Sequence, residues 1–420
     1  MVGKSQKISR RRFLQTTAVG ATGGVVLSDL LQSRSGAARS AQQSAPASGD
    51  LANGGLDIAG VIMATSKIDG KPRIDLISLR NNHILATFEG IDASHAVVPV
   101  ESWNRFFVHG RDVQTGQGMI WGLEIDLETE AWTVIYEQQL DGGLILHWQP
   151  NHDYSLIQYN STESQALHIL DTKTLDLQTY QGGGTHSTMA FFNQDNWLVA
   201  TDHLGDGTQL RIIDRATNTI LAETAVGNWG HGLTVNHQTE RAFVWANEGV
   251  HMVSLAQRTL GDHLGVIQPL APGQRSWFCW TPQGGRYSHD QTLNPGDRFS
   301  PWLTVIDMET ATLEKIETGD EQAGTLQISP DGKIGISGSH SSNHVCLFDI
   351  QANTFLGTVA VGHGNHAFFD RDAAFSRDRT LAFVTNPPDQ TITAIDIRGM
   401  EAIAQINLPA PPQWMKVLTI

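Results

Sequence analysis

The sequence repeats a short apolar run that ends in an acidic residue. Two weaker copies of this run end in serine instead. The endings of the eight runs are 40 to 53 residues apart, and no helical periodicity lies between them. A period of this size with several short strands per unit predicts a β-propeller. The eight runs are Leu76–Ser78, Leu123–Asp126, His168–Asp171, Arg211–Asp214, Met252–Ser254, Thr304–Asp307, Cys346–Asp349 and Thr393–Asp396.

One unit shows four strands in its hydrophobic pattern, at residues 186–192, 196–202, 208–214 and 219–226. Polar turns separate these strands, which are rich in β-branched and aromatic residues. We call them a to d in chain order. The pattern predicts an all-β fold, a single propeller of eight four-stranded blades. Seven blades are the alternative if the irregular unit around residues 254–307 is miscounted.

The first unit begins near Gly60 and lacks a strand a of its own. The segment "QWMKVLTI" at 413–420 is a spare strand with the right pattern to complete it. Such a closure would leave no free sheet edge between the first and last blades. We therefore expect the C-terminal strand to close the ring.

The N-terminal segment carries a targeting signal. Residues Ser9–Gln15 read "SRRRFLQ" and match the twin-arginine export pattern at every position but the last. The apolar stretch at 16–31 contains Asp29 and several glycines, so it is too short and too polar to span a membrane. We predict a twin-arginine signal peptide and linker at 1–47 and a propeller domain at 48–420. The protein is expected to be periplasmic or secreted, with no membrane insertion after cleavage.

Charge and cysteine content narrow the function further. The chain has 28 basic and 43 acidic residues, and removal of 1–47 leaves 21 against 42, a net charge of −21. Such a surface repels nucleic acid and attracts cations, so no nucleic-acid partner is expected. Only Cys279 and Cys346 are present. They could pair in an oxidising compartment, but they are too few for a thiolate-rich metal site.

Histidines are concentrated at particular positions of the units. In a propeller, the loop leading into strand a and the loop between strands b and c open on the same face. Ten of the 17 histidines are predicted to lie at these positions. Those at the start of strand a are His95, His147, His186, His231, His363 and His366. Those assigned to b–c loops are His109, His203, His289 and His340.

Converging imidazoles at the axis of a propeller suit a transition metal, because neutral histidine is a common ligand for Zn²⁺ and Cu²⁺. Asp202 and Asp206 could orient a ligating ring through its second nitrogen. Polar residues that cap strands are the competing interpretation, and His363 in particular suits a turn or a supporting contact. The predicted metal ligands are His95, His147, His186, His231, His363, His366, His203 and His340, with His95, His186, His231 and His366 as the first choice.

Two segments resemble known families. "SRDRTLAFVTNPPDQTITAIDIRG" at 376–399 resembles the YVTN-type repeat of secreted propellers, and residues 324–335 are similar to the first hairpin of that repeat. The corners "GHGLTVN" and "NHAFFD" resemble those of periplasmic propeller zinc metallochaperones that serve ABC importers. The first resemblance implies the fold, and the second implies metal binding with transfer to a partner.

The sequence therefore predicts an exported propeller that binds zinc, or else copper, in metal binding or delivery. Its expected partners are the metal ion and a periplasmic protein or transporter component. Two other classes stay open. One is a metal-free scaffold for protein interaction, and the other is a copper- or haem-dependent periplasmic oxidoreductase.

Overall fold

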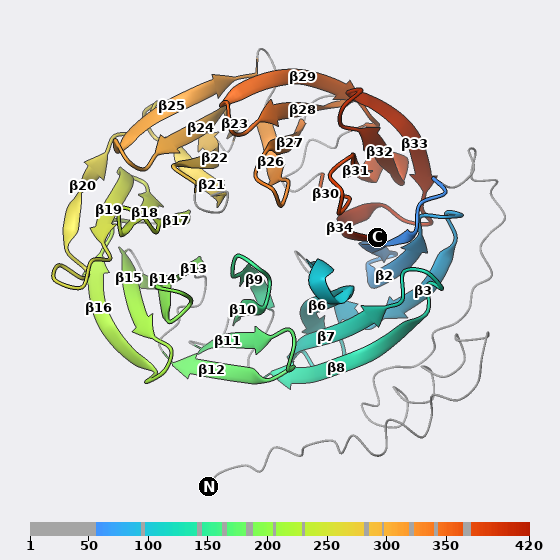
Figure 1. The fold of residues 1–420 in the computed structure, drawn as a ribbon, viewed down its shortest axis with the longest axis horizontal. Coiled ribbons are helices and arrows are strands. Elements are labelled where there is room, and N and C mark those ends of the chain that lie inside the picture. The colour runs from blue at the N-terminus through green and yellow to red at the C-terminus, as the bar shows by residue number, and fades with distance from the viewer. Residues whose placement is uncertain are drawn as a thin grey trace, which may run out of the picture.

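The computed structural model describes residues 56–93, 97–140, 145–161, 166–181, 188–204, 207–228, 232–280, 285–295, 298–318, 323–339, 343–363 and 371–420. Within these ranges, 34 strands form eight antiparallel sheets. The sheets stand around one axis as the blades of a closed ring (Figure 1). The predicted count of eight blades is confirmed. The predicted signal peptide at 1–47 lies outside the described residues.

Each blade places its strand a nearest the axis and its strand d at the rim (Figure 1). In order from strand a, blade 1 contains β34 (Pro412–Thr419), β1 (Gly60–Ile68), β2 (Lys71–Ser78) and β3 (Ile84–Glu89). Blade 2 contains β4 (Ile91–Asp92) and β5 (Val97–Val100), which both pair with β6 (Arg105–Asp112), then β7 (Gly118–Ile125) and β8 (Trp132–Leu140). Blade 3 contains β9 (Ile145–Pro150), β10 (Leu156–Ser161), β11 (Ala166–Asp171) and β12 (Leu177–Gln181). Blade 4 contains β13 (Met189–Phe192), β14 (Trp197–Leu204), β15 (Gly207–Asp214) and β16 (Thr219–Ala225).

The second half of the ring follows the same order. Blade 5 contains β17 (Leu233–Asn236), β18 (Arg241–Ala246), β19 (Gly249–Ser254) and β20 (His263–Ile267). Blade 6 contains β21 (Arg275–Trp280), β22 (Tyr287–Asn294), β24 (Trp302–Asp307) and β25 (Thr312–Glu317), with β23 (Arg298–Phe299) paired to β22. Blade 7 contains β26 (Ala323–Ile328), β27 (Ile334–Ser339), β28 (His344–Asp349) and β29 (Thr354–Ala360). Blade 8 contains β30 (Ala373–Phe375), β31 (Leu381–Asn386), β32 (Thr391–Asp396) and β33 (Glu401–Asn407). Two 3₁₀ turns are also described, η1 (Glu101–Trp103) and η2 (Pro387–Asp389).

The repeated acidic residue has a structural cause. It is the last residue of strand c or, in blade 2, the residue directly after it, and its side chain accepts backbone N–H groups from the c–d turn that follows. Asp126 Oδ1, for example, accepts from the amides of Glu128 and Thr129 at 3.0 and 3.1 Å. In blade 1, Ser78 Oγ does the same for Arg80 and Asn81. Short polar side chains suit this role because they reach the backbone two and three residues ahead.

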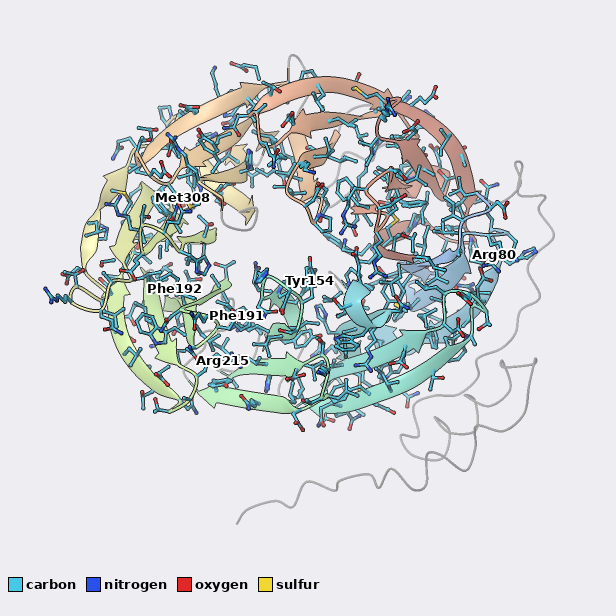
Figure 2. The ribbon with its side chains drawn as sticks, viewed as in Figure 1. Arg80, Tyr154, Phe191, Phe192, Arg215 and Met308 are labelled. Atoms are coloured by element: carbon cyan, nitrogen blue, oxygen red, sulfur yellow. The ribbon has the colours of Figure 1, made fainter. Side chains whose placement is uncertain are left out.

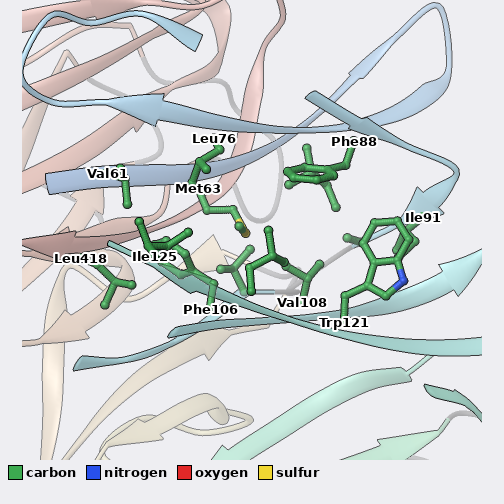
Figure 3. Close-up of a cluster of buried hydrophobic side chains, with 14 of the residues drawn as sticks. Val61, Met63, Leu76, Phe88, Ile91, Phe106, Val108, Trp121, Ile125 and Leu418 are labelled. Atoms are coloured by element: carbon green, nitrogen blue, oxygen red, sulfur yellow. The ribbon is translucent and has the colours of Figure 1, made fainter. Parts of the chain in front are cut away.

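The hydrophobic core lies between the blades. Eight clusters of buried side chains are described, and each joins one pair of neighbouring blades around the ring. Figure 3 shows the cluster between blades 1 and 2, where Met63 and Leu76 meet Phe106 and Trp121. Removal of this apolar surface from water is what holds successive blades together. A cation–π contact adds to this packing in blade 4, where the Arg215 guanidinium lies 5.8 Å from the centre of the Phe191 ring (Figure 2).

The C-terminal strand closes the ring, as predicted. β34 pairs antiparallel with β1, with Thr419 opposite Gly60 and Trp414 opposite Thr65. The start of the described chain and its end therefore share one blade. Among the described residues, no helix is long and apolar enough to cross a membrane.

Candidate metal site at the leading loops

The site is built where the chain leaves strand d of one blade and leads into strand a of the next. In blade 8 this leading loop begins at Val361, whose amide donates to Asn343 O at 2.8 Å. The Gly362 amide then donates to Asn386 Oδ1 at 3.1 Å. These bonds attach the loop to the residue before strand c of blade 7 and to the end of strand b of blade 8.

His363 is held by a carboxylate from the neighbouring b–c turn. Its backbone amide donates to Asp389 Oδ2 at 2.5 Å, and its ring Nδ1 lies 2.8 Å from Asp389 Oδ1. The ring itself is 67% exposed. Desolvation raises the pKa of Asp389, but the His363 hydrogen bonds and the nearby Arg371 charge outweigh it, so the pKa is lowered overall.

An ionised carboxylate only accepts hydrogen bonds, so His363 Nδ1 must carry the proton that it donates to Asp389. In the neutral ring the lone pair is then on Nε2. A histidine whose second nitrogen is held by a carboxylate has the usual arrangement of a metal ligand. The geometry therefore suits His363 to metal ligation through Nε2.

Blade 5 has a leading loop of the same construction. The Val226 amide donates to Thr208 O at 2.9 Å, and the Asn228 amide donates to Glu248 Oε2 at 3.1 Å. Glu248 is in the b–c turn of blade 5, as Asp389 is in the b–c turn of blade 8. Asn228 occupies the position that His363 has in blade 8. Glu248 therefore binds the backbone amide of this loop but has no imidazole at that position to hold.

The predicted ligands are described to different extents in the structure. His363 is described with its side chain, and His147 and His203 are described only as backbone positions on β9 and β14. The assignment of these histidines as metal ligands stays a prediction, because no contact among their rings is described. The predicted ligands that lie outside the described residues are His95, His186, His231, His340 and His366.

Two histidines that we assigned to b–c loops lie inside blades instead. His109 is on β6 and fully buried, with its ring 5.2 Å from that of Tyr159. His289 is on β22, also fully buried, and its Nε2 lies 2.8 Å from Asn353 Oδ1 of blade 7. The assignment was wrong because β6 and β22 continue past these residues before they turn.

Asp202 does not orient a ring in the described structure. Its Oδ2 lies 2.7 Å from the Arg211 guanidinium, which also binds Glu223. The carboxylate that does so in blade 8, Asp389, was not identified from the sequence. A signal was present, however. Residues 226–231 and 361–366 both read Val-Gly, then three residues, then histidine, and each loop has an acidic residue in the b–c turn of its blade.

A second histidine contact lies beside the blade 5 loop. His251 Nδ1 is 2.9 Å from His263 Nε2, and His251 Nε2 is 3.8 Å from Glu248 Oε2. Desolvation, followed by the neighbouring His263, lowers the pKa of His251. Across the part of the chain that the structure describes, no group of three or more His, Cys, Asp or Glu side chains is arranged to hold a metal.

Comparison with known proteins gives the fold. No family model matches the sequence, and no curated protein sequence matches it. Apo AztD from Citrobacter koseri is similar in structure, with a TM-score of 0.64 and 14% identity over 86% of this chain and 98% of that one. Dihydro-haem d1 dehydrogenase NirN, in complex with DHE, has a TM-score of 0.59 and 12% identity over 87% and 76%. A functionally unknown protein from Desulfotomaculum acetoxidans has a TM-score of 0.51 and 12% identity over 77% and 98%. At these identities the likeness shows a shared propeller fold.

Proposed function

We propose that this chain is an exported β-propeller that binds a transition metal, zinc before copper, at its leading loops, and that it serves in metal binding or delivery. The observation that carries the proposal is the His363–Asp389 contact. It holds an exposed imidazole, with its lone pair on Nε2 in the neutral ring, in the loop that leads from blade 7 into blade 8. From the sequence, the other predicted ligands are assigned to the entries of strand a (His95, His147, His186, His231 and His366) or to b–c loops (His203 and His340).

The ligand chemistry of histidine favours a transition metal as the bound ion. Histidine nitrogen suits Zn²⁺ and Cu²⁺, whereas hard cations such as Ca²⁺ prefer sets of carboxylate and carbonyl oxygens. The strongly acidic chain raises the local concentration of cations around the protein. A delivery role adds a protein partner, a periplasmic receiver or transporter component, to which the metal would pass.

Metal analysis of the purified protein without residues 1–47 tests this function. We expect close to one Zn²⁺ per chain, or uptake to that level when Zn²⁺ or Cu²⁺ is added. The double variant H231A/H366A should lose most of this binding. The matched control is H83A/H152A, because His83 and His152 are exposed histidines of a c–d and an a–b turn. Binding far below one ion per chain, or equal loss in both double variants, would contradict the proposal.

The fold shared with a dihydro-haem d1 dehydrogenase supports one alternative, a haem- or copper-dependent oxidoreductase. Zn²⁺ has a filled d shell and gives no visible colour, whereas haem absorbs strongly. A visible absorption band in the purified protein would therefore favour the alternative over zinc.

A further inference from the structure

Two leading loops, those of blades 5 and 8, share one hydrogen-bonded corner. In each, a valine comes directly after strand d, a glycine follows, and the next residue donates its amide to a carboxylate of the b–c turn. In blade 8 these groups are Gly362, His363 and Asp389. In blade 5 the amide donor is Asn228 and the acceptor is Glu248.

The glycine of each corner makes room for the carboxylate. A Cβ on Gly362 would lie 2.5 Å from Asp389 Oδ2, and a Cβ on Gly227 would lie 2.4 Å from Glu248 Oε2. Both distances are far shorter than a van der Waals contact. Any larger residue would therefore push the carboxylate away from the amide that it binds.

The corner in blade 8 is also attached from its other side. The buried Arg371 donates to Gly362 O and, at 3.1 Å, to His344 O. The Gly362 amide is bound to Asn386, whose own amide group donates to Thr391 and Thr393. The backbone of this corner is thus bound by two side chains, Arg371 and Asn386, that make further hydrogen bonds of their own.

We propose that Asp389 and Glu248 are positioning residues for metal binding. They fix Gly362–His363 and Gly227–Asn228 before metal arrives, and Asp389 also holds the His363 ring as the Nδ1–H tautomer with Nε2 free to ligate. The ligand part rests on the proposed function, and the tautomer part does not. Loops that are ordered in advance lose less conformational entropy on binding, and a carboxylate partner strengthens histidine as a ligand.

The first measurement uses the metal-free protein, labelled with ¹⁵N at histidine. Long-range ¹H–¹⁵N correlation spectra should show His363 as the Nδ1–H tautomer. In D389N this preference should be lost, because an amide can both donate and accept. In D389E, which keeps a carboxylate, part of it should return. An unchanged His363 signal in D389N would overturn the positioning role.

The second measurement is Zn²⁺ affinity by competition with a chelator of known affinity. D389N should weaken binding about 10- to 100-fold, the range for loss of a carboxylate that orients a ligating histidine. E248Q should weaken it less, because Glu248 binds the Asn228 amide and lies near His251, and neither residue is a predicted metal ligand. The matched control is D378N, since Asp378 accepts from Ser376 and Thr380 in the a–b turn of the same blade. Melting curves verify that each variant folds.

The outcomes separate the two proposals. A changed tautomer with unchanged Zn²⁺ affinity would overturn the assignment of His363 as a ligand. Equal losses of affinity in D389N and D378N would overturn the positioning role. If the parent protein takes up no metal, the proposed function fails, and the tautomer spectra alone then decide whether Asp389 holds His363.

Discussion

Lys416 binds Asp372 across the joint that closes the ring, with Nζ 2.7 Å from Oδ2. The carboxylate is fully buried, and the backbone amides of Met415 and Ala373 also donate to it. Burial raises the pKa of Asp372, and the Lys416 charge and these hydrogen bonds oppose that effect. A buried carboxylate with one cation beside it joins blade 8 to the closing strand of blade 1.

Replacement of this lysine should destabilise the protein strongly. K416M removes the cation and leaves a buried charge without its partner, which typically costs about 3–5 kcal/mol in the free energy of unfolding. Urea denaturation at neutral pH measures the loss. K315M is the control, because Lys315 and Glu317 form a mostly exposed pair worth about 1 kcal/mol or less. Equal losses in the two variants would contradict the importance of the closing ion pair.

The buried His289 should make stability depend on pH. Burial, partly offset by the Asn353 hydrogen bond, lowers its pKa from 6.5 to about 4. Below pH 6.5 the unfolded chain takes up a proton that the folded protein resists. The stabilisation is therefore present above pH 6.5 and is lost as the pH falls toward about 4, by about 3 kcal/mol in total.

The variant H289Q isolates this contribution. Its free energy of unfolding should fall less than that of the parent between pH 7 and pH 4.5, because glutamine does not titrate. H83Q, which replaces an exposed histidine, should follow the parent. Parallel pH profiles for the parent and H289Q would show that His289 does not titrate as expected.

Alanine at Gly227 should disrupt the blade 5 corner. Gly227 has φ +80°, and a Cβ there would also lie 2.7 Å from His251 Nε2. Gly70, with φ +75° and no atom within 4 Å of its Cβ position, is a matched control for backbone strain. We expect G70A to cost about 1 kcal/mol of stability and G227A about 2–3 kcal/mol. Hydrogen exchange of the Asn228 amide should become faster in G227A alone, and unchanged exchange would argue against the Glu248 contact.

A deletion and a circular permutation can test whether the ring needs the closing strand itself or its place at the end of the chain. Deletion of 412–420 exposes the edge of β1, and an open edge invites association with other chains. The deletion variant should therefore associate and lose cooperative unfolding. A circular permutant in which 412–420 precedes residue 56 should fold, since Thr419 already lies opposite Gly60. Circular dichroism and size-exclusion chromatography compare the two. A deletion variant that melts like the parent would show that the closure is dispensable.

The fold could be predicted because its signals are local. The Asp or Ser at the end of strand c marks the c–d turn of each blade, and the spare strand at 413–420 completes blade 1. The structure confirms both features. The face of a histidine was harder to predict. For His109 and His289 it depended on where a strand turns, and strands b of blades 2 and 6 continue beyond the expected place.

The candidate site could be predicted only in part. His363 was identified from its place in the chain, but its partner Asp389 is 26 residues away and meets it only when a b–c turn folds against a leading loop. Asp202 looked equally suitable and instead binds Arg211, because strand c places that guanidinium beside it. Contacts between hairpins that are distant in the sequence decide which carboxylate binds which imidazole ring. These contacts cannot be predicted from a single sequence.

Closure by β34 has a consequence for biosynthesis. Blade 1 receives its innermost strand from residues 412–419, which a ribosome makes after the other described strands. A product of translation that ends before residue 412 lacks this strand, however long the earlier blades have had to fold. A chain cut short therefore keeps an unpaired edge on β1 that chaperones and proteases can bind. For a protein proposed to leave the cytoplasm already folded, the ring is complete only once β34 has been made and paired with β1.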